Sequence, residues 1–153
     1  MDFKLLWDNH PANRAEDDEY PCVGYNGQPN YENQCAIKMG VCLERCKFDM
    51  SKFEGVKCWH HPRADNHILR VEELRLFFAN VLPNKSLTIK RKRPNRDISV
   101  EDFEGKSGIV IFCDFWGDNN QGDHVDLFNG EELADGDLDY FERSERVYLW
   151  EID

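Results

Sequence analysis

Two residue types that cooperate in thiol chemistry stand far apart in this chain, each at the start of a predicted element. Cys35 begins a predicted helix, and His124 begins a short predicted strand. A thiol attacks a carbonyl carbon as the thiolate, which the positive end of a helix dipole and a neighbouring imidazole both stabilise. The pair therefore predicts nucleophilic catalysis, with Cys35 as the nucleophile and His124 as the general base.

The helix that would carry Cys35 is predicted by a capping segment and an apolar period. Residues 31–34 read Tyr-Glu-Asn-Gln and can cap a helix. Ala36, Met39 and Leu43 then recur at the spacing of an amphipathic helix. Backbone N–H groups in the first turn of a helix can hold the oxyanion of a tetrahedral intermediate. We therefore expect an oxyanion site beside the cysteine.

His124 falls within a predicted hairpin. Residues 107–116 predict a buried strand, residues 117–123 a polar loop and residues 124–128 a second strand, after which Asn129-Gly130 is a hairpin turn sequence. The hairpin predicts an antiparallel sheet that carries the histidine.

An acid that orients the imidazole is expected near the same hairpin. Asp135 lies on the return path from the turn, where it can come back beside His124. Asp126 is the alternative, because residues two apart on a strand share a face, but such neighbours orient an imidazole less well than a cross-strand partner. Asp114 and Trp116, at the end of the preceding strand, are expected to line the substrate cleft, and core packing is the alternative for Trp116.

Five segments in a fixed order resemble the type VI secretion amidase effectors of family four. They are Cys35-Ala-Ile-Lys-Met39, the predicted helix 70–79, the strand 108–112, His124-Val-Asp-Leu-Phe-Asn-Gly130 and the closing Val147-Tyr-Leu-Trp-Glu151. The resemblance covers roughly residues 20–153. It implies an α+β, papain-like fold of the NlpC type, in which a nucleophile helix packs on a small antiparallel sheet.

The resemblance also implies a function. The chain resembles bacterial toxins that cleave the D-glutamyl–meso-diaminopimelate amide in peptidoglycan stem peptides. By this resemblance, Cys35 is the nucleophile, His124 the base and Asp135 the orienting acid. The implied partners are the stem peptides, a cognate immunity protein and a type VI secretion component, and no metal or cofactor is required. The family usually has a glycine directly before the histidine, whereas Asp123 follows Gly122 here, which predicts a more acidic approach to the site.

Composition predicts one compact domain over residues 1–153, with residues 1–20 as an irregular lead-in. The chain is 41% hydrophobic and 12% aromatic, which is ordinary for a globular domain. The net charge of −11 argues against a nucleic-acid partner. No segment approaches the roughly 20 apolar residues of a membrane span, and the short, charged amino terminus is unlike a secretory signal. Together with this, the resemblance implies synthesis in the bacterial cytoplasm without such a signal and secretion into the periplasm of a target cell.

Local charge runs leave two interpretations open. Residues 85–96 are basic and predict either an anion or cell-wall contact or a solvated loop. The acidic runs 16–19 and 135–139 favour solubility, with a basic partner such as an immunity protein as the alternative.

Six cysteines are many for a chain of this length. Cys113 is expected to be a small buried apolar residue. Four others could form disulfides in an oxidising periplasm: Cys22, Cys42, Cys46 and Cys58. The alternative is a zinc site built from the last three with His60 or His61, although paired Cys-x2-Cys knuckles are missing.

The remaining pattern fits an α+β layout. Residues 66–81 predict a second amphipathic helix, and strands dominate from Leu87 onward. Two other functions stay open: a thiol enzyme that acts on protein glutamines, and a non-catalytic binding module in which the cysteines are structural.

Overall fold

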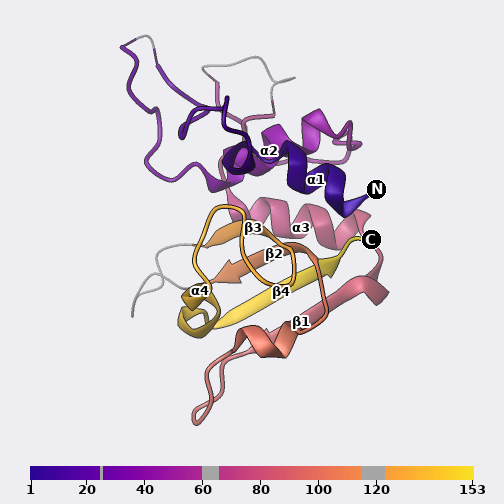
Figure 1. Ribbon diagram of the computed structural model, residues 1–153. Coiled ribbons are helices and arrows are strands. Elements are labelled where there is room, and N and C mark those ends of the chain that lie inside the picture. The colour runs from indigo at the N-terminus through magenta and orange to yellow at the C-terminus, as the bar shows by residue number, and fades with distance from the viewer. Residues whose placement is uncertain (25, 60–65, 115–122) are drawn as a thin grey trace. The chain divides into compact units, whose positions relative to one another are not determined.

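The computed structural model describes residues 1–24, 26–59, 66–114 and 123–153 (Figure 1). Contacts divide the chain into two compact units, residues 4–81 and residues 1–3 with 82–153. We call them the helical unit and the sheet unit and describe each by itself. Within the described ranges, every helix is too short or too polar to cross a bilayer. The single domain expected over residues 1–153 stays a prediction.

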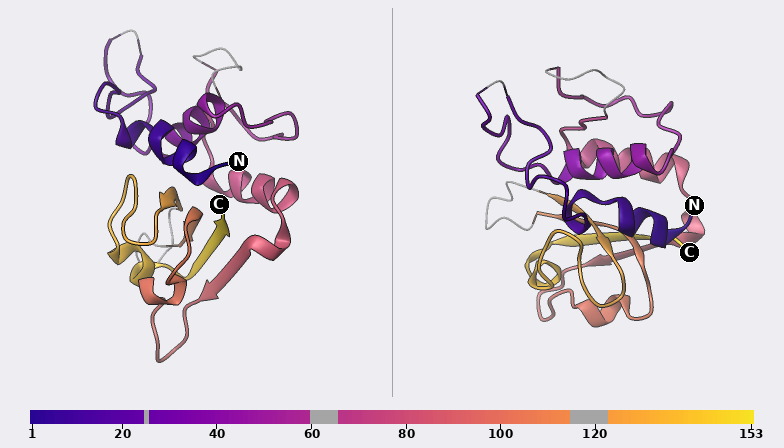
Figure 2. Two further views of the ribbon diagram at one scale, coloured as in Figure 1. Left: turned by 45° about the vertical axis from the view of Figure 1, so that its right-hand side comes forward. Right: turned by 45° about the horizontal axis from the view of Figure 1, so that its top comes forward.

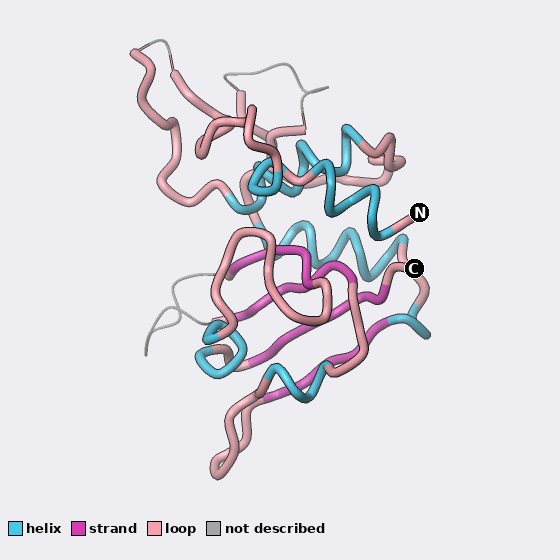
Figure 3. The backbone as a smooth tube through the Cα atoms, in the orientation of Figure 1, coloured by secondary structure: helices cyan, strands magenta, loops and turns pink. Residues whose placement is uncertain are grey.

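Three α-helices lie in the described residues of the helical unit (Figure 3). A short 3₁₀ turn, Pro11–Asn13, follows the first helix. The helices are α1 (Phe3–Asn9), α2 (Cys35–Arg45) and α3 (Val71–Val81). The predicted helix at Cys35 is therefore confirmed.

Helix α1 lies within the segment that we expected to be irregular. Leu6 is fully buried and anchors the helix in the core. Lys4 and Asp8 form an ion pair one turn apart, and the side-chain amide of Asn9 donates to the Leu5 carbonyl at 2.8 Å. One buried side chain and these local bonds order a short helix that has too few apolar positions to be recognised from its period.

Helix α3 begins later than predicted, at Val71 rather than residue 66. The preceding residues are extended, because Ile68 pairs with Lys57 in an isolated antiparallel bridge and the Cys58 N–H donates to the His67 carbonyl at 2.8 Å. Within the helix, Leu74 and Phe78 are fully buried, as the amphipathic pattern predicts.

Gly40 allows the backbone of this extended segment to lie close to α2. A Cβ atom at Gly40 would come within 2.0 Å of the Asn66 carbonyl oxygen. Asn66 itself has a positive φ of 51°. The glycine therefore sets how closely the 66–68 backbone can approach the helix that begins at Cys35.

The sheet unit is a four-stranded antiparallel sheet in the order β1-β4-β2-β3 (Figure 2). The 3₁₀ turn Asn84–Ser86 precedes the first strand, and connections between later strands contain the 3₁₀ turn Val100–Phe103 and the short helix α4 (Asp139–Arg143). The strands are β1 (Leu87–Arg91), β2 (Gly108–Cys113), β3 (His124–Phe128) and β4 (Arg146–Glu151). The predicted α+β class and small antiparallel sheet are confirmed.

One face of the sheet carries an aromatic core. Phe112 on β2 meets Phe141 of α4 edge-on, with ring centroids 4.9 Å apart, and Phe103 packs against Phe141 at 5.5 Å. Phe112 is paired with His124 across the sheet. Since directly opposed residues of an antiparallel pair point to the same face, His124 lies on the face that this aromatic core covers.

Candidate active site

The imidazole of His124 is bonded to the carboxylate of Asp126 on the same strand. The His124 Nε2 and Asp126 Oδ2 atoms are 2.8 Å apart, and both residues are buried. The carboxylate also accepts hydrogen bonds from the backbone N–H groups of Leu127 at 2.8 Å and Asp135 at 3.0 Å. A carboxylate fixed from several directions holds the ring in one orientation.

The turn after β3 determines which acid reaches the imidazole. Gly130 has a φ of 96°, and the side-chain oxygen of Asn129 accepts from the N–H groups of both Glu131 and Glu132 at 2.8 Å. Phe128 then pairs with Leu133 as an isolated bridge. The hairpin turn predicted at Asn129-Gly130 is therefore present.

This register sets Asp135 opposite Asp126 rather than opposite His124. The Ala134 N–H donates to the Leu127 carbonyl at 3.0 Å, and the Asp135 N–H reaches the Asp126 carboxylate. The return path comes back beside the strand as predicted, but Asp135, the favoured acid, brings its backbone to the site. Asp126, the alternative, brings its carboxylate to the ring.

Aromatic rings enclose the imidazole on the core side. The Tyr140 ring lies edge-on to the His124 ring, with centroids 5.1 Å apart and an interplanar angle of 80°. Burial, followed by the nearby Asp137 charge, raises the pKa of Tyr140, so its hydroxyl stays protonated at neutral pH. A Cβ at Gly136 would lie 2.5 Å from the Tyr140 ring and 3.1 Å from Asp126 Oδ2. The glycine therefore leaves the space that the Tyr140 ring and the Asp126 carboxylate occupy beside it.

Gly136 and Tyr140 were missed from sequence because the acidic run 135–139, which Tyr140 directly follows, suggested solubility or a basic partner rather than a position beside His124. The helix that presents Tyr140 is five residues long, too short to show a period. The sequence signal for Tyr140 was the aromatic pair Tyr140-Phe141 directly after that acidic run.

Cys35 is the first residue of α2, and its side chain is almost fully buried. Its backbone N–H donates to Asn33 Oδ1 at 3.1 Å, so a residue of the predicted capping segment does bind the helix start. Gln34, which was also expected to cap the helix, makes no side-chain capping bond. Its side chain bonds both backbone groups of Cys22 at 2.8 Å, which ties the segment at residue 22 to the start of α2.

Of the two residues expected to line the cleft, Trp116 lies outside the described residues. Asp114 follows β2 and has a φ of 62°. Its N–H donates to Asp123 Oδ1 at 3.0 Å, and its carboxylate is 3.9 Å from Arg146. Asp123, the acidic residue directly before the histidine, thus bonds the end of the neighbouring strand. Substrate binding by Asp114 and Trp116 stays a prediction.

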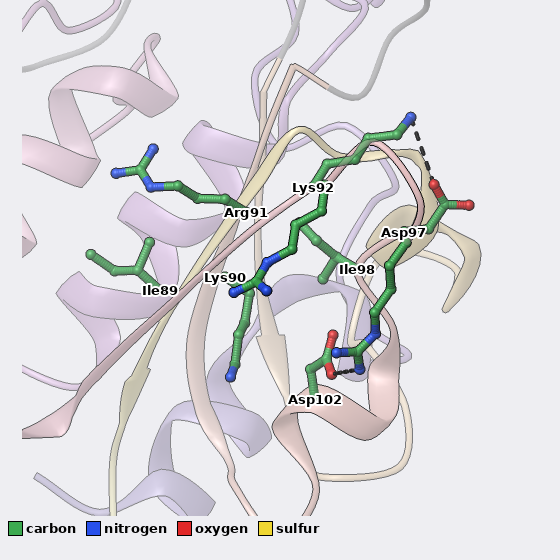
Figure 4. A pocket seen from close by; sticks show the side chains of 9 residues that line it. Ile89, Lys90, Arg91, Lys92, Asp97, Ile98 and Asp102 are labelled. Atoms are coloured by element: carbon green, nitrogen blue, oxygen red, sulfur yellow. Dashed lines mark hydrogen bonds and ion pairs between the residues drawn. The ribbon is translucent and has the colours of Figure 1, made fainter.

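The basic segment forms a surface pocket at the end of β1 (Figure 4). Two acids reduce its charge, because Lys92 lies 3.7 Å from Asp97 and Arg96 lies 2.5 Å from Asp102. Its basic lining residues nevertheless outnumber the two acids: Lys90, Arg91, Lys92, Arg93 and Arg96. An anion or cell-wall contact stays a prediction.

The cysteines proposed for zinc do not form one cluster, although Cys42 and Cys46 hydrogen-bond to each other. Cys42 Sγ donates to the Leu6 carbonyl at 3.2 Å, and Cys46 Sγ to the Leu5 carbonyl at 3.5 Å, whereas Cys58 lies beside Cys22. His60 and His61 lie outside the described residues. In the described part of the chain, no three His, Cys, Asp or Glu side chains cluster as metal ligands.

A model of the family "type VI secretion system, amidase effector protein 4" (Tae4) matches residues 31–150. Among solved structures, Tae4 from a Tae4–Tai4 complex of Salmonella typhimurium is 21% identical, with a TM-score of 0.73 over 99% of this chain and 98% of that one. Tae4 from Enterobacter cloacae is 20% identical, with a TM-score of 0.69 over 99% and 96%. Comparison with the curated proteins found no match.

These likenesses define the fold as α+β and papain-like, of the NlpC/P60 type. Within that class, the chain belongs to the Tae4 family, the family-four amidase effectors of type VI secretion. The resemblance proposed from the five sequence segments is confirmed.

Proposed function

We propose that this chain is an antibacterial toxin, delivered by type VI secretion, that hydrolyses the D-glutamyl–meso-diaminopimelate amide of peptidoglycan stem peptides with Cys35 as nucleophile. Membership of an amidase effector family supports amide hydrolysis. The bond would be cleaved in the periplasm of the target cell.

The observation that carries the proposal is the buried pair of His124 and Asp126. Both oxygens of Asp126 accept backbone N–H bonds, so the carboxylate acts as an acceptor and the His124 Nε2 atom is the donor. A neutral imidazole that carries its proton on Nε2 is basic at Nδ1. The Nδ1 atom of His124 is therefore the atom that would take the thiol proton.

The reaction proceeds as acyl transfer in two steps. Nδ1 of His124 accepts the proton of Cys35, and the thiolate attacks the stem-peptide carbonyl. The Cys35 N–H, which donates to Asn33 Oδ1 in the structure, would turn to the oxyanion. The amine leaves with the proton from His124, and water then hydrolyses the thioester.

An immunity protein is the proposed macromolecular partner. The solved Salmonella typhimurium relative is a complex of an effector with its immunity protein, Tai4. A cell that makes such a hydrolase would need a comparable inhibitor of the same enzyme. Purified inhibitor should bind this chain and abolish release of peptidoglycan fragments in proportion to the amount of complex.

The decisive experiment is mass spectrometry of peptidoglycan fragments after incubation with the wild type and with Cys35→Ala. We expect tetrapeptide stems to be lost and dipeptide-bearing products to appear with the wild type alone. Cys113→Ala is the matched control, because it removes a buried thiol from β2 and should leave the activity unchanged.

Intact stems after incubation with folded, reduced wild type would contradict the proposal. Ammonia release from protein glutamines would then test for a thiol enzyme acting on protein. If neither substrate reacts, a non-catalytic binding role would account for the chain.

A further inference from the structure

Two buried cysteines of the helical unit lie next to each other. The Sγ atoms of Cys22 and Cys58 are 3.7 Å apart, although the residues are 36 positions apart in sequence. Both side chains are buried, with exposed fractions of 0% and 2%. Ile37 of α2 completes this small core, against which Tyr31 and Leu69 pack.

Hydrogen bonds hold the backbone on both sides of this pair. The Gln34 side chain bonds the N–H and the carbonyl of Cys22, each at 2.8 Å, and the Cys58 N–H donates to the His67 carbonyl at 2.8 Å. A disulfide requires a sulfur separation of about 2.0 Å. The sulfurs therefore need to approach by only about 1.7 Å from their 3.7 Å separation, a movement that side-chain rotation and small backbone shifts can supply.

Each sulfur atom accepts a hydrogen bond from a polar side chain. The Asn30 side-chain amide donates to Cys22 Sγ at 3.3 Å, and the Tyr31 hydroxyl donates to Cys58 Sγ at 3.6 Å. The bond to Cys58 raises the pKa of Tyr31 to about 12, so the hydroxyl keeps its proton and remains a donor. Donors of this kind stabilise the thiolate that thiol–disulfide exchange requires.

We propose that Cys22 and Cys58 form a disulfide when the chain reaches an oxidising compartment. That this compartment is the target periplasm rests on the proposed function. The oxidant is a small-molecule or protein disulfide. Cys58 thiolate attacks one of its sulfurs, which forms a mixed disulfide and releases one thiol. Cys22 thiolate then attacks the Cys58 sulfur and releases the second thiol. Two cysteine thiols are oxidised and one disulfide is reduced.

The order of attack follows from the surroundings of the two thiols. Burial raises the pKa of the Cys22 thiol, which disfavours it as the first nucleophile. Cys58 is followed by Trp59, whose side chain is 81% exposed, so Cys58 lies directly beneath the surface. Cys58 therefore meets the oxidant and Cys22 resolves the mixed disulfide.

The bond would enclose the whole of α2. The closed loop runs from residue 22 to residue 58 and contains Cys35, and Gln34 already joins Cys22 to the start of that helix. Closing a loop of this length restricts the unfolded chain. The disulfide would therefore stabilise the element that carries the proposed nucleophile and leave Cys35 itself as a thiol.

Peptide mapping of the full chain tests this proposal. The reduced Cys35→Ala protein is equilibrated in an oxidised/reduced glutathione buffer, alkylated and digested with trypsin. We expect the peptide that begins at Cys58 to be joined to the peptide 15–38, in which Cys22 is then the one remaining cysteine. The melting temperature should rise by on the order of 10 °C over that of the reduced protein.

Cys58→Ala should lose both the cross-link and the temperature shift, whereas Cys46→Ala, which removes a half-buried thiol at the end of α2, should keep both. If Cys58→Ala does not fold, differential alkylation of wild type decides the question. Full alkylation of Cys58 after equilibration, or a cross-link from Cys58 to any other cysteine, would overturn the proposal. None of these measurements uses peptidoglycan, so their failure is distinct from failure of the proposed amidase.

Discussion

The imidazole of His124 and the carboxylate of Asp126 meet at 2.8 Å although they are neighbours on one strand. Asp126 can reach the ring because both side chains point to the same face of β3. Backbone N–H groups from Leu127 and from the return path hold the carboxylate in place. The arrangement assigns orientation of the imidazole to Asp126 under the proposed mechanism.

Asp126→Asn should reduce kcat by about 10²–10⁴-fold, because the amide can present the wrong hydrogen-bonding partner to His124 and carries no charge to stabilise the imidazolium. The measurement is the rate of stem-peptide hydrolysis, with circular dichroism to confirm folding. Asp135→Asn is the matched control. Its N–H, which makes the bond to Asp126, is retained, so a change of less than about fivefold is expected. The opposite ranking of the two variants would assign the role to Asp135.

Tyr140→Ala should lower kcat by roughly 3- to 10-fold, because loss of an aromatic pair frees the His124 ring. Tyr140→Phe keeps the edge-on ring and should retain nearly full activity. Nuclear magnetic resonance of the imidazole protons would report the altered ring environment in Tyr140→Ala alone. Equal losses in both variants would instead indicate that the hydroxyl takes part in the reaction.

Asp17 should make the stability of the helical unit pH-dependent. Arg45, in the last turn of α2, binds the Asp17 carboxylate at 2.6 Å and 3.0 Å, and this hydrogen bonding lowers the pKa of Asp17. A folded-state pKa below the unfolded value adds stability above the unfolded pKa, and that stability is lost as pH falls through the folded pKa. Asp17→Asn should therefore cost about 1 kcal/mol at neutral pH.

The difference between wild type and Asp17→Asn should begin to shrink below about pH 4, where the unfolded-state carboxylate takes up protons, and should be lost as pH falls through the lower folded-state pKa. Urea denaturation of both proteins from neutral pH down to about pH 2 measures this difference in unfolding free energy. Asp18→Asn is the control for the loss of one negative charge from the same acidic run. A difference that is constant down to pH ~2 would contradict the role of the Arg45 bond.

Gly40→Ala should destabilise the helical unit by about 1–3 kcal/mol, since the added Cβ meets the Asn66 carbonyl oxygen at 2.0 Å. In an unobstructed helix the same change would stabilise by roughly 1 kcal/mol. The sign of the change in unfolding free energy is therefore the readout. The control is the difference in unfolding free energy between Glu44→Ala and Glu44→Gly. Glu44 is exposed on α2, so this difference measures helix propensity without the clash.

Local sequence patterns were sufficient to predict the main helices and strands. The α2 helix carries a capping segment and an apolar period, and the strand β3 ends at the turn sequence Asn129-Gly130. The predicted start of α3 was wrong because backbone hydrogen bonds to residues 57 and 58 hold the preceding residues extended. No local sequence pattern encodes these bonds. Long-range pairing overrode the helical propensity there.

The candidate site was predicted in its residue types but not in its detailed contacts. Whether Asp126 or Asp135 reaches His124 depends on how many residues the turn contains, and the two-residue motif alone did not reveal that the return strand begins at Leu133. Tyr140 belongs to a short helix that is ordered by tertiary packing on the sheet. Such packing has no sequence period to recognise.

The turn after β3 also determines which mutations this chain can tolerate. Glu131 and Glu132 are exposed, and it is their backbone that bonds Asn129. Their side chains can therefore vary among residues that keep a backbone N–H, which excludes proline. Insertion or deletion of a single residue between Asn129 and Leu133 is different, because it would shift the pairing by one and turn the Asp135 N–H away from Asp126. In this hairpin, selection should act on the length of the loop more strongly than on its composition.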